Sequence, residues 1–416
     1  MLGIAGAVVA LGELNDRLGP SRDHPAIQYR DGPLTDPVTT LNQKLDSGDV
    51  RLEFVGPQGY LRSLLAALQV PIESQIAVFS KTSQQFERIG PGNPRTIFFN
   101  DSVAVAWMYG GFIELASHDP KRGVIFHTLS QQPGSQPRLE RRGDCLRCHL
   151  SDASLGVPGM MIRSMFTGPD GGPRLILGGS LVGHRTPMED RWRGYYVTGA
   201  TTAVRHMGNA MVTDEENTRS MITAATLKLD SLESKFDTKH YLSPYSDAAA
   251  LMVFDHQMHM MNLITRVGWE VRAAQYDAQH KQPTGGAALL REAAVEIVDY
   301  LLFIDEAQLS GQLESGSRFA ATFAAQGPRD AKGRSLRDLD LQNRLLRYPC
   351  SYMIYSEAFE ALPAEAKAAI YERMWRVLSG RVREKKYMRL SLADRQAILE
   401  ILRDTKKGLP EYFQQP

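Results

Sequence analysis

The chain has 416 residues, of which 43% are hydrophobic and 23% are charged, a balance typical of an ordinary globular protein rather than a disordered chain. Its 48 Lys and Arg residues against 47 Asp and Glu residues give a net charge of +1, which excludes a strongly basic nucleic-acid-binding protein, so we expect no nucleic-acid partner. The sequence contains no run of apolar residues long enough for a membrane helix, so we predict no transmembrane span.

The first part of the chain is rich in strand signals. After two expected short helices at 38–47 and 59–68, apolar runs with β-branched and aromatic residues alternate with Gly, Pro, Asn and Asp. These runs predict strands at 75–79, 96–99, 103–108, 112–116, 123–129, 159–166, 175–177 and 192–198. We therefore expect a mixed, mostly antiparallel β region.

The pattern changes after residue 210. Helical periodicity predicts helices at 244–279, 287–304, 363–378 and 391–403. The predicted fold class is α+β, with a β-rich region at 21–210 followed by an all-α region at 211–416. Residues 1–20 are a possible signal or anchor remnant, because 2–11 is an apolar run of suitable length, although no basic residue precedes it.

Two of the three cysteines lie in one short motif. Residues Cys145–His149 read Cys-Leu-Arg-Cys-His, and Cys-x-x-Cys-His is the attachment sequence of c-type haem. Two thiols at this spacing form thioethers with the haem vinyl groups, and the adjacent imidazole ligates the iron. We therefore expect one covalent haem c on Cys145 and Cys148, with His149 as an iron ligand.

The motif resembles that of c-type cytochromes, and the stretch 99–209 is loosely similar to large bacterial single-haem cytochrome c-like proteins of unassigned function. This resemblance implies electron transfer with a redox partner protein that the sequence does not identify. It also implies a periplasmic or otherwise exported protein, because bacteria attach haem c outside the cytoplasmic membrane. Since several predicted strands precede the motif, we do not expect the compact helical cytochrome c fold.

Other interpretations of the motif stay open. A thioredoxin-like pair also uses two such cysteines, a zinc site would need two more ligands, and a structural disulfide would leave His149 unexplained. A haem enzyme acting on peroxide, oxygen or a nitrogen oxide at an open distal site is an alternative to electron transfer. A haem-based sensor or binding module is another.

The sequence leaves the second iron ligand undecided. On the predicted long helix, His256 lies at the centre of an apolar stripe, whereas His259 lies on a polar stripe, where we expect it to be solvated or bonded to Asp255. A buried imidazole needs a partner, which is either the haem iron or a protein group. We predict His256 as the ligand. The alternatives are an open site or one of several other side chains, namely Met260, His206, His184, and Met161 or its neighbours Met160 and Met165.

Arginines near the motif are candidates for binding the haem propionates. Arg142 and Arg185 are our predictions, because a guanidinium pairs with a carboxylate through two parallel hydrogen bonds. The alternative is that neighbouring acidic residues or water pair with them. We expect the third cysteine, Cys350, to be a buried structural residue.

Overall fold

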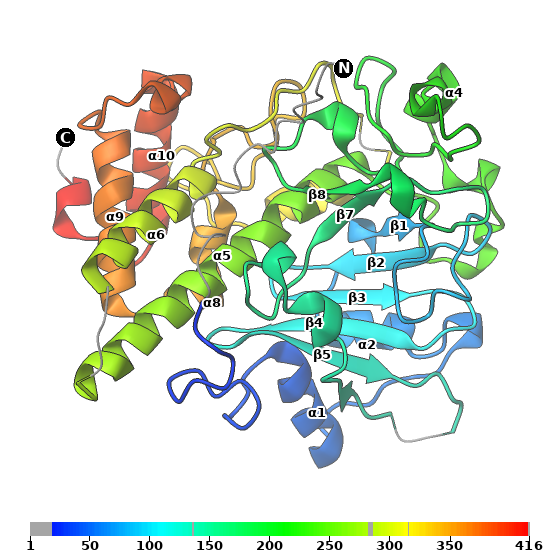
Figure 1. Ribbon diagram of the computed structural model, residues 1–416, viewed down its shortest axis with the longest axis horizontal. Helices are drawn as coiled ribbons and strands as arrows, with labels where there is room; N and C mark the ends of the chain where they lie inside the picture. The colour runs from blue at the N-terminus through cyan, green and yellow to red at the C-terminus, as the bar shows by residue number, and fades with distance from the viewer. Residues whose placement is uncertain (1–18, 135–136, 282–285, 315, 415–416) are drawn as a thin grey trace.

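The computed structural model describes residues 19–134, 137–281, 286–314 and 316–414. The predicted signal or anchor remnant at 1–20 lies almost entirely outside the described residues. The strands occupy the N-terminal half and the long helices the C-terminal half, which confirms the α+β class (Figure 1). No helix in the described ranges is both long and apolar enough to cross a bilayer.

Seven strands form one antiparallel sheet in the order β6-β5-β4-β3-β2-β1-β9. The strands are β1 (Ile76–Val78), β2 (Arg95–Phe99), β3 (Val103–Trp107), β4 (Ile113–Asp119), β5 (Gly123–Leu129), β6 (Glu140–Arg141) and β9 (Tyr195–Tyr196). A separate hairpin pairs β7 (Ile162–Met165) with β8 (Gly179–Val182).

Two strand predictions are corrected. Leu175–Leu177 forms a 3-10 turn instead of a strand, and its Leu175 and Ile176 side chains are 73% and 88% exposed. The predicted strand at 192–198 shortens to β9, because Trp192 adopts a left-handed conformation with φ of 70°. A short apolar run carries too little periodicity to separate a strand from an exposed turn.

The two faces of the sheet pack against different helices. Cross-strand register places Phe98 and Val105 on one face, where they share a core with α1 (Pro37–Ser47) and α2 (Leu61–Ala67). The opposite face carries Phe99 and Ala104, which belong to a larger core that includes Phe254 of the long helix α5. This larger core contains residues of both the strand-rich and the helical region.

Helix α5 (Ala248–Gln279) crosses the molecule diagonally between the sheet and the C-terminal helices (Figure 1). It begins after Asp247, whose side chain caps the first turn by accepting hydrogen bonds from two backbone N–H groups. The other helices are α3 (Leu146–His149), α4 (Ala224–Leu227), α6 (Gly286–Leu301), α7 (Phe319–Ala325), α8 (Glu357–Glu360), α9 (Ala364–Leu378) and α10 (Leu392–Thr405).

The polar stripe of α5 faces protein. Its Asn262 donates a hydrogen bond of 2.7 Å to the backbone oxygen of Met160, and its Arg266 donates one of 2.8 Å to that of Leu155. His259, expected to be solvated or bonded to Asp255, instead packs its ring 4.5 Å from that of Tyr300. Loops from the N-terminal half cover this stripe and need donors for their carbonyl groups, which helical periodicity alone does not reveal.

Candidate functional site

The cysteine motif forms a single helical turn. Cys145 is the N-cap of α3, and its backbone oxygen accepts hydrogen bonds from the N–H groups of Cys148 at 3.1 Å and His149 at 3.0 Å. Both cysteines are free thiols, and Cys148 is exposed whereas Cys145 is partly buried. One turn of helix therefore presents two thiols and an imidazole from adjacent positions.

The His149 ring is fixed by the backbone. Its Nδ1 lies 3.0 Å from the carbonyl oxygen of Gly159, whose own N–H donates to the His149 carbonyl at 3.0 Å. Because a carbonyl only accepts, Nδ1 carries the hydrogen and Nε2 holds the lone pair. The ring also packs 4.8 Å from that of Phe126 on β5.

The imidazole is neutral near neutral pH. Burial lowers the pKa of His149 to about 4, and the positive charges of Arg95 and Arg163 lower it too, against the opposing effect of the Gly159 hydrogen bond. A neutral ring with Nδ1 protonated is the form in which Nε2 can bind a metal.

The Cys145 thiol stays protonated near neutral pH. Burial raises the pKa of Cys145 to about 11, and the negative charges of Asp144 and Glu114 raise it further. A dithiol oxidoreductase needs a lowered thiol pKa, so these surroundings argue against the thioredoxin-like interpretation. Within the described ranges no three His, Cys, Asp or Glu side chains converge as a metal-ion site, so a zinc site lacks its further ligands there.

The segment that carries His149 lies between the sheet and α5. The N–H of Val124 on β5 donates to the carbonyl of Pro158 at 2.9 Å, and Asn262 on α5 holds the next turn at Met160. Gly159 leaves room for this contact, since a Cβ there would meet the Asn262 side-chain oxygen at 2.1 Å. Both regions of the chain thus position the imidazole.

His256 has protein partners at both ring nitrogens. Its Nδ1 lies 2.8 Å from Nδ1 of His184 and its Nε2 lies 2.7 Å from the Ser351 hydroxyl, inside a fully buried environment. Burial lowers the pKa of His256 to about 3. In this arrangement neither nitrogen is free for iron. These contacts favour the alternative in which His256 is a core histidine with protein partners and not an iron ligand.

The other predicted ligands differ in accessibility. His206 is buried with Nδ1 accepting from the Gly208 N–H at 3.0 Å and Nε2 lying 3.2 Å from the Leu227 carbonyl. Met260 is completely buried in the core. Met161 is partly exposed and lies two residues beyond Gly159 in the chain. Among these candidates, Met161 is the accessible side chain closest in sequence to the motif.

The two predicted propionate-binding arginines already have carboxylate partners. Arg142 pairs with Asp144 at 2.8 Å, and Arg185 pairs with Glu296 on α6 at 3.0 Å while its guanidinium lies over the Tyr300 ring. The structure therefore favours the alternative in which acidic residues pair with them. Cys350 is fully buried, which confirms the expectation for it.

Sequence reasoning missed two arginines, Arg95 and Arg163, whose positive charges lower the pKa of His149. Arg95 is the first residue of β2, and its side chain is 17% exposed. Its buried Nε has no hydrogen-bond partner within the described part of the chain. Arg163 lies on β7 and is exposed. Arg95 lies 50 residues before Cys145 in the sequence, and no local sequence signal links it to the motif. Its position in the fold depends on strand pairing.

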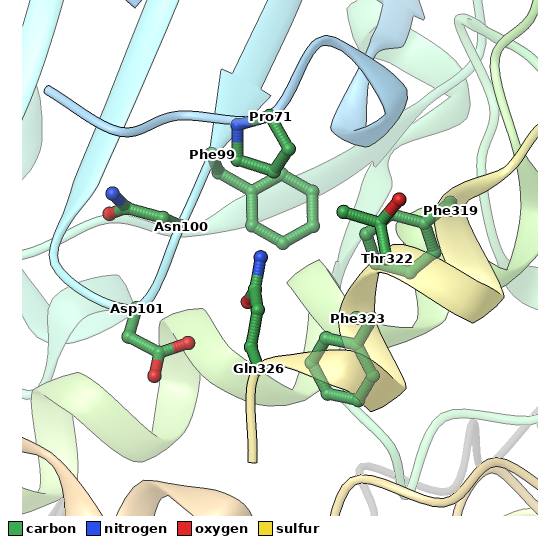
Figure 2. A pocket seen from close by; sticks show the side chains of 8 residues that line it. All are labelled: Pro71, Phe99, Asn100, Asp101, Phe319, Thr322, Phe323 and Gln326. Carbon is green, nitrogen blue, oxygen red and sulfur yellow. The ribbon is translucent and has the colours of Figure 1, made fainter. Parts of the chain in front are cut away.

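A separate small cavity lies where the end of β2 meets α7. Figure 2 shows the side chains around it, which include Phe99, Asn100 and Phe323. Its volume is about 10 Å³, which is room for about one water molecule. This cavity is too small for a substrate or cofactor.

Comparisons of the chain with protein-family models, with curated proteins and with solved structures give no match. The function therefore has to be argued from the residues and their geometry.

Proposed function

We propose that this protein is an exported c-type haem protein that transfers electrons through one covalently bound haem c. The observation that carries the proposal is the backbone-fixed His149, with its lone pair on Nε2, one residue from the second of two free thiols. A ligating imidazole whose other nitrogen donates to a carbonyl is the usual arrangement in metal sites.

Each motif side chain has a defined role in this proposal. The S–H groups of Cys145 and Cys148 would add across the two vinyl groups of a haem, each forming one C–S bond while its hydrogen goes to the other vinyl carbon. This addition needs no oxidant, and the protonated state of Cys145 suits it. His149 would supply an imidazole nitrogen to the iron. When bound, the haem supplies one-electron exchange between ferric and ferrous iron.

The surroundings favour electron transfer over the enzyme alternative. Peroxide or oxygen chemistry would need a positioned acid–base group on the open side of the iron. His256, the histidine predicted to face the iron, is instead bonded to Ser351 and His184. The exposed Cys148 instead places the attachment point at the surface, where a redox partner protein can approach. Export to the periplasm follows from where bacteria attach haem c.

Visible spectra of the purified haem-loaded protein, oxidised and reduced, with and without carbon monoxide, test this proposal. We expect a six-coordinate, low-spin haem that binds carbon monoxide poorly when reduced. Rapid carbon monoxide binding by the wild type would contradict a simple carrier and support an open-site enzyme or sensor.

Substitution of His256 by alanine should destabilise the fold and leave the spectrum unchanged. Loss of the imidazole leaves His184 and Ser351 without their buried partner and opens a cavity, at a cost of about 2–4 kcal/mol in the free energy of unfolding. Urea unfolding measures that cost. Met161→Ala is the comparison, because it should open the iron to carbon monoxide if Met161 is the second ligand. A high-spin spectrum in His256→Ala would contradict this expectation and identify His256 as an iron ligand.

A further inference from the structure

We propose that Arg95, together with Arg163, binds the propionate carboxylates of the haem held by Cys145, Cys148 and His149. This inference rests on the proposed function, and it replaces the two arginines that the sequence indicated. Four observations support it: an incompletely paired, mostly buried guanidinium, its connection to the motif, a partly exposed part of the sheet between them, and a second arginine whose charge also acts on His149.

Arg95 is a buried cation with unused hydrogen-bonding capacity. Its closest carboxylate contact is to Glu114 at 3.6 Å, longer than the 2.8 Å and 3.0 Å ion pairs of Arg142 and Arg185. Its buried Nε has no hydrogen-bond partner among the residues that the structure describes. A buried guanidinium is costly unless its donors are satisfied, so this group is suited to an additional carboxylate.

A short series of contacts connects Arg95 to the motif. The Glu114 carboxylate that faces Arg95 accepts a hydrogen bond from the Ser83 hydroxyl at 2.9 Å. The next residue, Gln84, places its side-chain nitrogen 3.6 Å from Sγ of Cys145. The Ser83 hydroxyl therefore fixes the Glu114 carboxylate that faces Arg95. The Nε of Arg95 is then left as a donor for a second carboxylate.

The sheet between His149 and Arg95 carries small, partly exposed side chains. Phe126 on β5, which contacts His149, pairs with Ala116 on β4 and so shares its face. The same face continues through Ala106 on β3, and both alanines are partly exposed although their strands are central.

The strand spacing sets the distance across this partly exposed face. Neighbouring strands lie about 4.8 Å apart, so β5 and β2 are about 14 Å apart across the sheet. A haem attached beside β5 would have its propionates held by Arg95 if it extended across β4 and β3 toward β2.

Arg163 approaches from the β7–β8 hairpin. On β7 the side chains of Ile162 and Ser164 are buried, whereas Arg163 between them is exposed. Arg163 forms no ion pair with any residue that the structure describes. Its positive charge, like that of Arg95, lowers the pKa of His149.

The test is the midpoint potential of the haem-loaded protein in Arg95→Met, Arg95→Lys and Arg163→Met variants. Loss of a positive charge beside the propionates favours the ferric state, so we expect a lower potential in both methionine variants. Arg95→Lys keeps the charge and should restore most of the wild-type value. Arg163→Met keeps the inference testable should Arg95→Met fold poorly, because Arg163 is exposed.

Arg122→Met is the matched control. Arg122 pairs with Asp119 at the opposite end of β4, and its side chain is also mostly buried, so we expect no change in potential there. Unchanged potentials in Arg95→Met and Arg163→Met, with haem bound, would overturn the inference and leave the proposed function standing. Absence of covalent haem from the wild type would instead overturn the proposed function.

Discussion

Replacing both Cys145 and Cys148 with serine should remove all covalently bound haem from the protein. Serine hydroxyls do not add to vinyl groups under the conditions in which thiols do, and these two cysteines share the helical turn that presents His149. The measurement is haem staining after denaturing electrophoresis, in which the wild-type band should stain and the double variant should not.

The third cysteine provides the control for this experiment. Cys350 is completely buried in the core, so Cys350→Ser should keep its haem stain and change only the stability. A stained band from the Cys145→Ser/Cys148→Ser protein, or an unstained wild type made in cells that attach haem c, would contradict the attachment site.

Asp255→Ala should give the largest loss of stability of any single substitution considered. Asp255 and Arg191 form a 3.4 Å ion pair with side chains 0% and 1% exposed, and Asp255 also accepts a hydrogen bond of 2.9 Å from the Trp192 indole. Removing one partner of such a pair leaves a buried charge uncompensated, at a cost of about 3–5 kcal/mol. Urea unfolding of the variant and the wild type measures this difference.

Two further variants show whether the cost arises from the unpaired charge. Asp170 forms a surface pair with Arg174, and Asp170→Ala should change the stability very little, because water screens such pairs. Asp255→Leu combined with Arg191→Met removes both charges and should recover part of the loss. Equal costs for Asp255→Ala and Asp170→Ala would contradict the buried-pair explanation.

The Asp255 carboxyl should also make the free energy of unfolding depend on pH. Burial raises the pKa of Asp255 from 3.8 to about 7, against the opposing effects of Arg191 and Trp192. Between about pH 4 and pH 7 the folded protein therefore keeps a proton that the unfolded chain releases, so the contribution of Asp255 to the free energy of unfolding falls as the pH rises through this range. Asp255→Asn should flatten that slope.

The fold was predictable where local patterns were long. The run at 123–129 became β5 with the same bounds, and the predicted helix at 363–378 became α9. The prediction at 175–177 was wrong because three apolar residues have no distinguishable period. Helix α5 begins at Ala248 rather than at residue 244, because Asp247 supplies the side-chain cap.

The site was only partly predictable, because several of its contacts join distant parts of the chain. The Cys145–His149 motif could be recognised directly from its spacing. The apolar stripe correctly indicated that His256 is buried, but its partners His184 and Ser351 are 72 and 95 residues away. Likewise, the position of Arg95 relative to the strand that contacts His149 depends on the pairing of β2 to β5 through two other strands.

Mass spectrometry of the peptide that spans Cys145–His149 tests the central claim most directly. The wild-type protein, purified from cells that attach haem c, would be denatured, extracted with acidified organic solvent and digested. The proposal predicts a peptide heavier by one haem, with thioether links at both Cys145 and Cys148. A peptide of unmodified mass with two free thiols, and haem in the solvent or none at all, would contradict it.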